Sequence, residues 1–235
     1  MCIRDRNTLA QIIEKKINKI NNLKKNITIE SLNKRITENN SFIDFKEKIE
    51  KNIKSNKISI IAEIKKASPS AGVIINDYDP LKIAQIYESN KATCLSVLTE
   101  EDFFFGNLIH ISKIKQKINL PVLCKDFFFD KFQVHLAKSY GADAILIIIA
   151  GVNDKLADQL YEEAQMLKMS VIVEVHTVEE AKKALRFNEA LIGINNRNLK
   201  TLKTEISTTY EINDFLKDHD VPLISESGIK TKEAV

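Results

Sequence analysis

The chain has 235 residues, of which 44% are hydrophobic and 29% are charged, and its formal net charge is +3. This length and balance suit one barrel-sized domain or two small ones, with a sizeable buried core. The longest apolar run, Ala144 to Ala150, is far shorter than the roughly 20 residues of a membrane-spanning helix, which argues against a membrane protein.

The first part of the chain, residues 9–53, has a helical pattern without a strand signal. The apolar stripe that predicts the first helix runs through Leu9, Ile12, Ile13, Ile17 and Ile20. A second helix is predicted over Ser41–Ile53. Residues 1–57 hold 14 Lys/Arg and 7 Asp/Glu, a balance of +7, and the remainder holds 21 and 25, a balance of −4. Because these lysines lie between apolar residues without interleaved aromatics, they indicate a solvated helix face rather than a nucleic-acid site.

From residue 58 onward, short β-branched runs alternate with amphipathic stretches. The predicted strands are Ile58–Ile64, Thr93–Leu98, Val122–Lys125, Ala144–Ile149, Val171–Val175, Leu191–Ile194 and Leu223–Ser225. The predicted helices are Pro80–Ser89, Asn107–Lys117, Lys131–Tyr140, Asp154–Lys168, Val178–Leu185 and Ser207–Lys217. Asp79 before Pro80 is typical of a helix N-cap, and Thr177 to Glu180 fits a capping box.

Strand–helix alternation with continuously apolar strands predicts a parallel sheet covered by helices, and seven units without a linker favour a closed barrel. We therefore predict an α/β fold, a (β/α)8 TIM barrel over residues 58–235 with an N-terminal helical extension over 1–57. Residues 231–235 resemble the first turn of the seventh helix. We expect the barrel to be truncated before its eighth strand.

Polar side chains follow the apolar core of five predicted strands. The two-residue period of a strand puts Glu63 and Lys65 on the same face. The other strands supply Lys125, Glu174, Asn195 to Arg197 and Glu226 to Gly228. Glu174 is notable because valines flank it on both sides. Since the carboxyl ends of barrel strands form the active site, these residues predict a single pocket rich in acids, bases and amides.

The ordered motifs resemble the indole-3-glycerol-phosphate synthase family. The matching segments are Glu63 to Ser70, Leu95 to Glu100, Lys125 to Phe127, Val173 to His176, Gly193 to Leu199 and Ser225 to Ile229. The resemblance implies a decarboxylating ring closure of 1-(2-carboxyphenylamino)-1-deoxyribulose 5-phosphate in tryptophan biosynthesis. It implies a small sugar-phosphate substrate and no cofactor. Fusion to, or association with, other enzymes of that pathway stays open.

The resemblance also implies roles for the catalytic candidates. Lys125 is expected to be the general acid at the substrate carbonyl, with its pKa lowered toward neutrality by cations such as Lys65. Lys65 would pair with substrate anions, and Glu63 would position it. Glu174 would be the general base of the dehydration, with its pKa raised by burial, and Asn195 would bind the carboxylate or hydroxyls.

The remaining candidates are expected to bind substrate. Arg197 is an expected anion partner, and Glu226 would orient its neighbours. Ser227 and Gly228 would hold the phosphate, with Ser68 assisting from the first loop. One phenylalanine from each of the clusters 103–105 and 127–129 is expected beside the substrate ring, with Phe103 chosen from the first cluster.

Two alternatives remain open at this point. Another phosphate-binding barrel, such as a phosphoribosylanthranilate isomerase, would need a different acid–base pair and no decarboxylation. A non-catalytic module could use the basic leader to bind an acidic partner. The three cysteines, Cys2, Cys94 and Cys124, and the four histidines have no spacing typical of zinc or disulfides. We therefore expect no metal ion, and a cytoplasmic location.

Overall fold

The sheet that the sequence predicts is present in the computed structural model, which describes residues 8–38, 42–199, 201–229 and 231. Seven parallel strands follow one another in chain order around the sheet. They are β1 (Ile61–Ile64), β4 (Cys94–Leu98), β5 (Val122–Lys125), β6 (Ala144–Ile148), β7 (Ser170–Val175), β8 (Leu191–Asn195) and β9 (Leu223–Glu226). The predicted strands are confirmed, with shifts of one to three residues at some ends.

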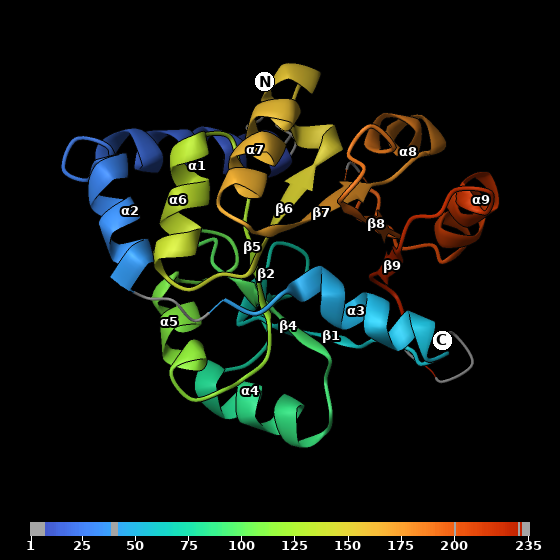
Figure 1. The fold of residues 1–235 in the computed structure, drawn as a ribbon, viewed down its shortest axis with the longest axis horizontal. Coiled ribbons are helices and arrows are strands. Elements are labelled where there is room, and N and C mark those ends of the chain that lie inside the picture. The colour runs from blue at the N-terminus through green and yellow to red at the C-terminus, as the bar shows by residue number, and fades with distance from the viewer. Residues whose placement is uncertain (1–7, 39–41, 200, 230, 232–235) are drawn as a thin grey trace.

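Within the described residues, six α-helices alternate with the strands. They lie around the outside of the sheet in sequence order, from α4 to α9 (Figure 1). They are α4 (Pro80–Ser89), α5 (Ile109–Lys115), α6 (Lys131–Ser139), α7 (Asp154–Met166), α8 (Val178–Ala184) and α9 (Ser207–Leu216). Asp79 caps α4 as predicted. A full capping box, which the sequence analysis did not identify, starts α6 at Asp130. The curled parallel sheet with these outer helices is a TIM-barrel-like α/β fold.

In the described part of the chain, three helices precede the sheet: α1 (Thr8–Leu23), α2 (Ile29–Glu38) and α3 (Phe45–Lys54). Helix α3 begins at Phe45 because Asp44 is its N-cap, whereas Ser41 was predicted. Phe45 and Ile49 pack into the inner cluster of the sheet. The Lys46 backbone N–H donates to Ser170 Oγ at 3.1 Å. Since Ser170 begins β7, α3 covers the end of the sheet where the strands start.

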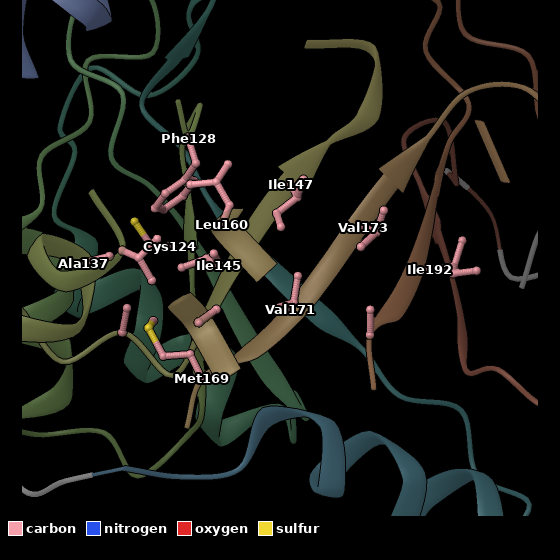
Figure 2. Packing of buried hydrophobic residues seen from close by; sticks show 14 of the residues in the cluster. Cys124, Phe128, Ala137, Ile145, Ile147, Leu160, Met169, Val171, Val173 and Ile192 are labelled. Atoms are coloured by element: carbon pink, nitrogen blue, oxygen red, sulfur yellow. The ribbon is translucent and has the colours of Figure 1, made fainter. Parts of the chain in front are cut away.

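The two faces of the sheet have separate cores, as the two-residue period requires. Outward side chains such as Ile145, Val171 and Val173 pack against the helices in the larger cluster (Figure 2). Inward side chains such as Leu146 and Ile172 form the smaller cluster with α3. Burying each such side chain stabilises the fold by about 1.5–3 kcal/mol. Apolar packing therefore fills the inside of the sheet up to the carboxyl ends of its strands.

Some local predictions were wrong. A hairpin of β2 (Ala67–Ser68) and β3 (Gly72–Val73) follows β1, and strands of two residues are too short for a periodic signal. The first strand starts at Ile61 rather than Ile58. Residues 232–235, in the predicted last helical turn, lie outside the described residues. The division of the chain at residue 57 stays a prediction.

No helix in the described ranges is both long enough and apolar enough to cross a membrane. The expected cytoplasmic location stays a prediction.

Candidate active site

Lys125 lies between two carboxylates at the carboxyl end of the sheet. Its Nζ is 3.1 Å from Glu174 Oε2 on β7, and it also forms an ion pair with Glu226 Oε2 on β9. The three side chains are 15%, 3% and 18% exposed, respectively. Parallel pairing produces this cluster, because β5, β7 and β9 all end at the same edge of the sheet.

The expected pKa of Lys125 was wrong in direction. Burial lowers the pKa, but the carboxylates of Glu226 and Glu174 outweigh burial and hold it above its ordinary value. Lys65, the cation expected to lower it, forms an ion pair with Glu63 instead. Lys125 is therefore a firmly protonated ammonium ion.

The expected pKa of Glu174 was also wrong in direction. Burial raises the pKa, as expected, but Lys125, His176 and Asn195 together lower it to about 2. Asn195 donates from Nδ2 to Glu174 Oε1 at 3.1 Å. Burial removes water from an ionised group, but a cation and hydrogen-bond donors at contact distance compensate for that loss. Glu174 is therefore an anion at neutral pH.

The third member of the cluster, Glu226, has its pKa raised, because burial and the charge of Glu174 outweigh the attraction of Lys125. Its Oε1 has no hydrogen-bond partner within the described residues. Gly193 on β8 leaves room for this carboxylate, since a Cβ atom at Gly193 would lie 2.4 Å from Oε1. The buried cluster thus contains one lysine and two glutamates, with one carboxylate oxygen unpartnered.

Glu63 and Lys65 extend the cluster toward β1. Their side chains form an ion pair and are 37% and 25% exposed, while Ile64 between them is fully buried. The charge of Glu63 acts on both Lys125 and Glu226. The predicted shared face of Glu63 and Lys65 is therefore present, beside the buried cluster.

Of the predicted binding residues, Arg197 and Ser68 meet through the first loop. Arg197 Nη1 donates to Ser70 Oγ at 3.4 Å, and Ser70 Oγ lies 3.4 Å from Ser68 Oγ. Phe103 lies against the N-terminal helix, where Lys15 Nζ is 5.0 Å from its ring centroid. Phe103 N–H donates to Glu100 Oε2 at 2.7 Å.

Ser227 and Gly228 form a left-handed turn after β9, with φ angles of 69° and 81°. A serine rarely adopts this conformation, which costs about 1–2 kcal/mol. Asn196, which the strand-end pattern placed in the pocket without a role, supports the turn: its Nδ2 donates to the carbonyls of Glu226 and Ser227 at 3.0 and 3.1 Å. Its position directly after a strand end was the sequence signal, and its 2% exposure shows that the side chain faces inward.

His176 was predicted only as the end of a family motif, without a role of its own. It follows β7 directly, and its Nε2 is 3.4 Å from Glu174 Oε1. The predicted capping box at Thr177 is half formed: Thr177 accepts from Glu180 N–H, but Glu180 accepts from His176 N–H rather than from Thr177. A histidine two residues after a buried glutamate places both side chains at one edge, which is the signal that could have identified it.

Within the described part of the chain, no group of three or more His, Cys, Asp or Glu side chains is arranged to hold a metal ion. The cluster offers other chemistry. A buried ammonium beside a carboxylate can donate a proton on one side and accept one on the other, and amide and serine groups lie at the same edge. This combination suits acid–base chemistry on an anionic molecule.

Known proteins are similar to this sequence over nearly its whole length. The sequence model of the family described as indole-3-glycerol phosphate synthase matches residues 9–235. A protein named indole-3-glycerol phosphate synthase from Prochlorococcus marinus (strain MIT 9301) is 44% identical, over 97% of this chain and 78% of the relative. Proteins of the same name from Desulforamulus reducens and Aliarcobacter butzleri are 39% and 40% identical, over 97% of this chain and 84% and 86% of theirs. The chain therefore belongs to the indole-3-glycerol phosphate synthase family.

Proposed function

We propose that this chain converts 1-(2-carboxyphenylamino)-1-deoxyribulose 5-phosphate to indole-3-glycerol phosphate, with loss of carbon dioxide and water. Family membership supports this reaction. The observation that carries it is the Lys125 ammonium between two buried carboxylates at the strand ends. The reaction needs a proton donor at a carbonyl and a later proton acceptor, and this cluster contains both.

Lys125 acts as the general acid during ring closure. An aromatic ring carbon attacks the ribulose carbonyl, whose oxygen becomes an alkoxide. An ammonium with a raised pKa still protonates this oxygen, because the alkoxide is the stronger base. The cation also stabilises the developing negative charge in a buried, low-dielectric site. Proton transfer and charge stabilisation thus come from the same group.

Glu174 acts as the base of the later dehydration. Lys125 is the main cause that lowers the pKa of Glu174, so that pKa rises when Lys125 gives up its proton. The acid step therefore prepares the base step, because the two groups are 3.1 Å apart. This coupling explains how a carboxylate with a pKa of about 2 in the resting protein takes up a proton during turnover.

Lys65 exchanges its ion-pair partner Glu63 for the substrate carboxylate. Glu63 then positions Lys65 and the substrate ring. Because this ion pair is partly exposed, the exchange costs little. Asn195 binds a substrate hydroxyl or carboxylate, and Glu226 orients Lys125.

The phosphate binds at Ser227 and Gly228, with Arg197 and Ser68 contributing from the neighbouring loops. The backbone turn of Ser227 and Gly228 and the contact of Arg197 with the first loop support this location. Phe103 forms an apolar wall for the anthranilate ring.

The finer fold assignment belongs to the same proposal. Among the described residues, β1 pairs only with β4 and β9 only with β8 in the main sheet. An eighth strand between β9 and β1 would complete a (β/α)8 barrel. Fusion to, or association with, other enzymes of tryptophan biosynthesis remains part of the proposal and needs its own test by copurification.

The test is incubation with the carboxyphenylamino substrate while indole fluorescence is followed. The background is low because the chain has no tryptophan. We expect indole fluorescence together with release of one carbon dioxide per product. Product formation without carbon dioxide release, as in an isomerisation, would reject the proposal.

A further inference from the structure

His176 occupies the position between β7 and α8, beside the buried cluster. Its side chain is 9% exposed, so it is nearly removed from water. Both ring nitrogens face carboxylates: Nδ1 is 3.2 Å from Glu180 Oε2, and Nε2 is 3.4 Å from Glu174 Oε1. The contact with Glu174 is an ion pair without hydrogen-bond alignment.

The start of α8 fixes the ring of His176. Glu180 Oε2 accepts from the His176 backbone N–H at 2.7 Å and also contacts Nδ1 of the ring. One carboxylate therefore contacts both the backbone and the side chain of His176. Glu180 is held in turn by the cap, since its N–H donates to Thr177 Oγ1 at 3.2 Å. The imidazole therefore has little freedom to turn away from Glu174.

The charges around the ring favour the imidazolium form. A neutral imidazole has one nitrogen that only accepts, and that nitrogen would face a carboxylate. Burial lowers the pKa of His176, but Glu174 on β7 and Glu180 on α8 raise it to about 9. Lys125 on β5 faces the opposite oxygen of Glu174, and Asn195 on β8 is neutral. At neutral pH, these four side chains therefore form a row of alternating charge: Glu180 is an anion, His176 a cation, Glu174 an anion and Lys125 a cation.

We propose that His176 is a positioning residue for Glu174: anchored by Glu180, its imidazolium holds Oε1 of the Glu174 carboxylate together with Asn195. Oε2 then faces Lys125 and is the oxygen that takes up the proton. This inference rests on the proposed role of Glu174 as the base. It gives the Glu174 carboxylate one orientation, in which each oxygen has a separate task.

The test compares His176→Ala, His176→Gln and the control His219→Ala, which removes an exposed imidazole near the end of α9. We expect His176→Ala to lower kcat by about tenfold or more with little change in KM. Loss of the cation raises the pKa of Glu174, so the acid limb of the kcat profile moves to higher pH. His176→Gln keeps a donor without the charge, so it restores part of kcat but not the acid limb. His219→Ala changes neither.

A second readout does not use activity. In a histidine NMR titration of the unaltered chain, we expect the His176 imidazole to remain protonated at pH 7.5, and Glu180→Gln to lower its titration point. A neutral His176 ring at pH 7 would overturn the proposal. So would a His176→Ala variant whose kcat falls only with its folded fraction while its acid limb stays in place.

Glu174→Gln separates this proposal from the proposed function. If Glu174→Gln turns over like the unaltered chain, the base role fails and the positioning role fails with it. If Glu174→Gln is impaired but His176→Ala is not, only the positioning role fails. We expect His176→Ala to add no further loss of kcat in the Glu174→Gln background. An additive loss would overturn the proposal, because His176 would then act through another group.

Discussion

Replacing Lys125 by Met removes the shared cation of two buried carboxylates. Breaking a buried ion pair by removing one partner costs about 3–5 kcal/mol, because the remaining charge is left uncompensated. Glu174 and Glu226 are both left in this condition, 3% and 18% exposed. We therefore expect Lys125→Met to lower the free energy of unfolding by about that amount at pH 7.5.

The pH dependence has a definite sign. Without Lys125, the folded-state pKa values of both glutamates are higher than in the unaltered chain: that of Glu174 rises from its low value, and that of Glu226, which is already raised, rises further. Groups with raised carboxyl pKa values stabilise the fold below the unfolded pKa, and this contribution is lost as pH rises through the folded pKa. In the unaltered chain, the Glu174 pKa of about 2 has the opposite effect, stabilising above about pH 4.3 and fading toward pH 2. The stability cost of Lys125→Met should therefore be smaller at pH 5 than at pH 7.5.

Urea unfolding followed by circular dichroism at both pH values measures this cost, and indole fluorescence measures turnover. We expect turnover to fall by about 10²–10⁴-fold, the usual contribution of a general acid. The matched control is Lys65→Met, which also impairs turnover. Because Lys65 and Glu63 are 25% and 37% exposed, that variant should lose less than about 1 kcal/mol of stability. Equal stability losses in the two variants, or a pH-independent loss in Lys125→Met, would contradict the compensation of both carboxylates by Lys125.

Three further predictions concern the surroundings of the cluster. Lys16→Met breaks the buried 2.6 Å ion pair between α1 and Asp126, and should cost up to about 3–5 kcal/mol in urea unfolding; an unchanged midpoint would contradict it. Gly193→Ala displaces the Glu226 carboxylate, because Oε1 would lie 2.4 Å from the new methyl group. We expect kcat to fall while the circular dichroism spectrum is retained. Full activity would argue against the tight fit. Phe45→Ala leaves a cavity at the end of the inner core and should lower the free energy of unfolding by about 3–5 kcal/mol in the same assay. A loss below about 1 kcal/mol would mean that α3 does not close that end.

The repeating units and the edge that carries the chemistry could be predicted from local sequence. The β-branched run that ends at Ile64 and the apolar run of Ala144–Ile148 depend only on neighbouring residues, so they identified strands. Asp79 before Pro80 marked a helix start for the same reason. Because parallel strands end at one edge, polar residues after each strand predicted a common site.

The N-terminal region shows the limit of local patterns. Its helical character was predicted, but the packing of Phe45 and Ile49 inside the sheet was not. An amphipathic helix has an apolar face whatever surface it covers, and only the folded chain shows which surface that is. The β2–β3 hairpin was missed because each strand has only two residues.

Local sequence was enough to predict the order of the seven strands of the main sheet and the helices between them, the family resemblance and the identity of the charged residues at the strand ends. The charge state of those residues, in contrast, depends on the tertiary structure. Lys125, Glu174 and Glu226 are 49 to 101 positions apart in the chain but in contact in space. A pKa depends on distances between charges in three dimensions. The pKa values of Lys125 and Glu174 therefore shift in directions opposite to those expected from sequence neighbours and burial.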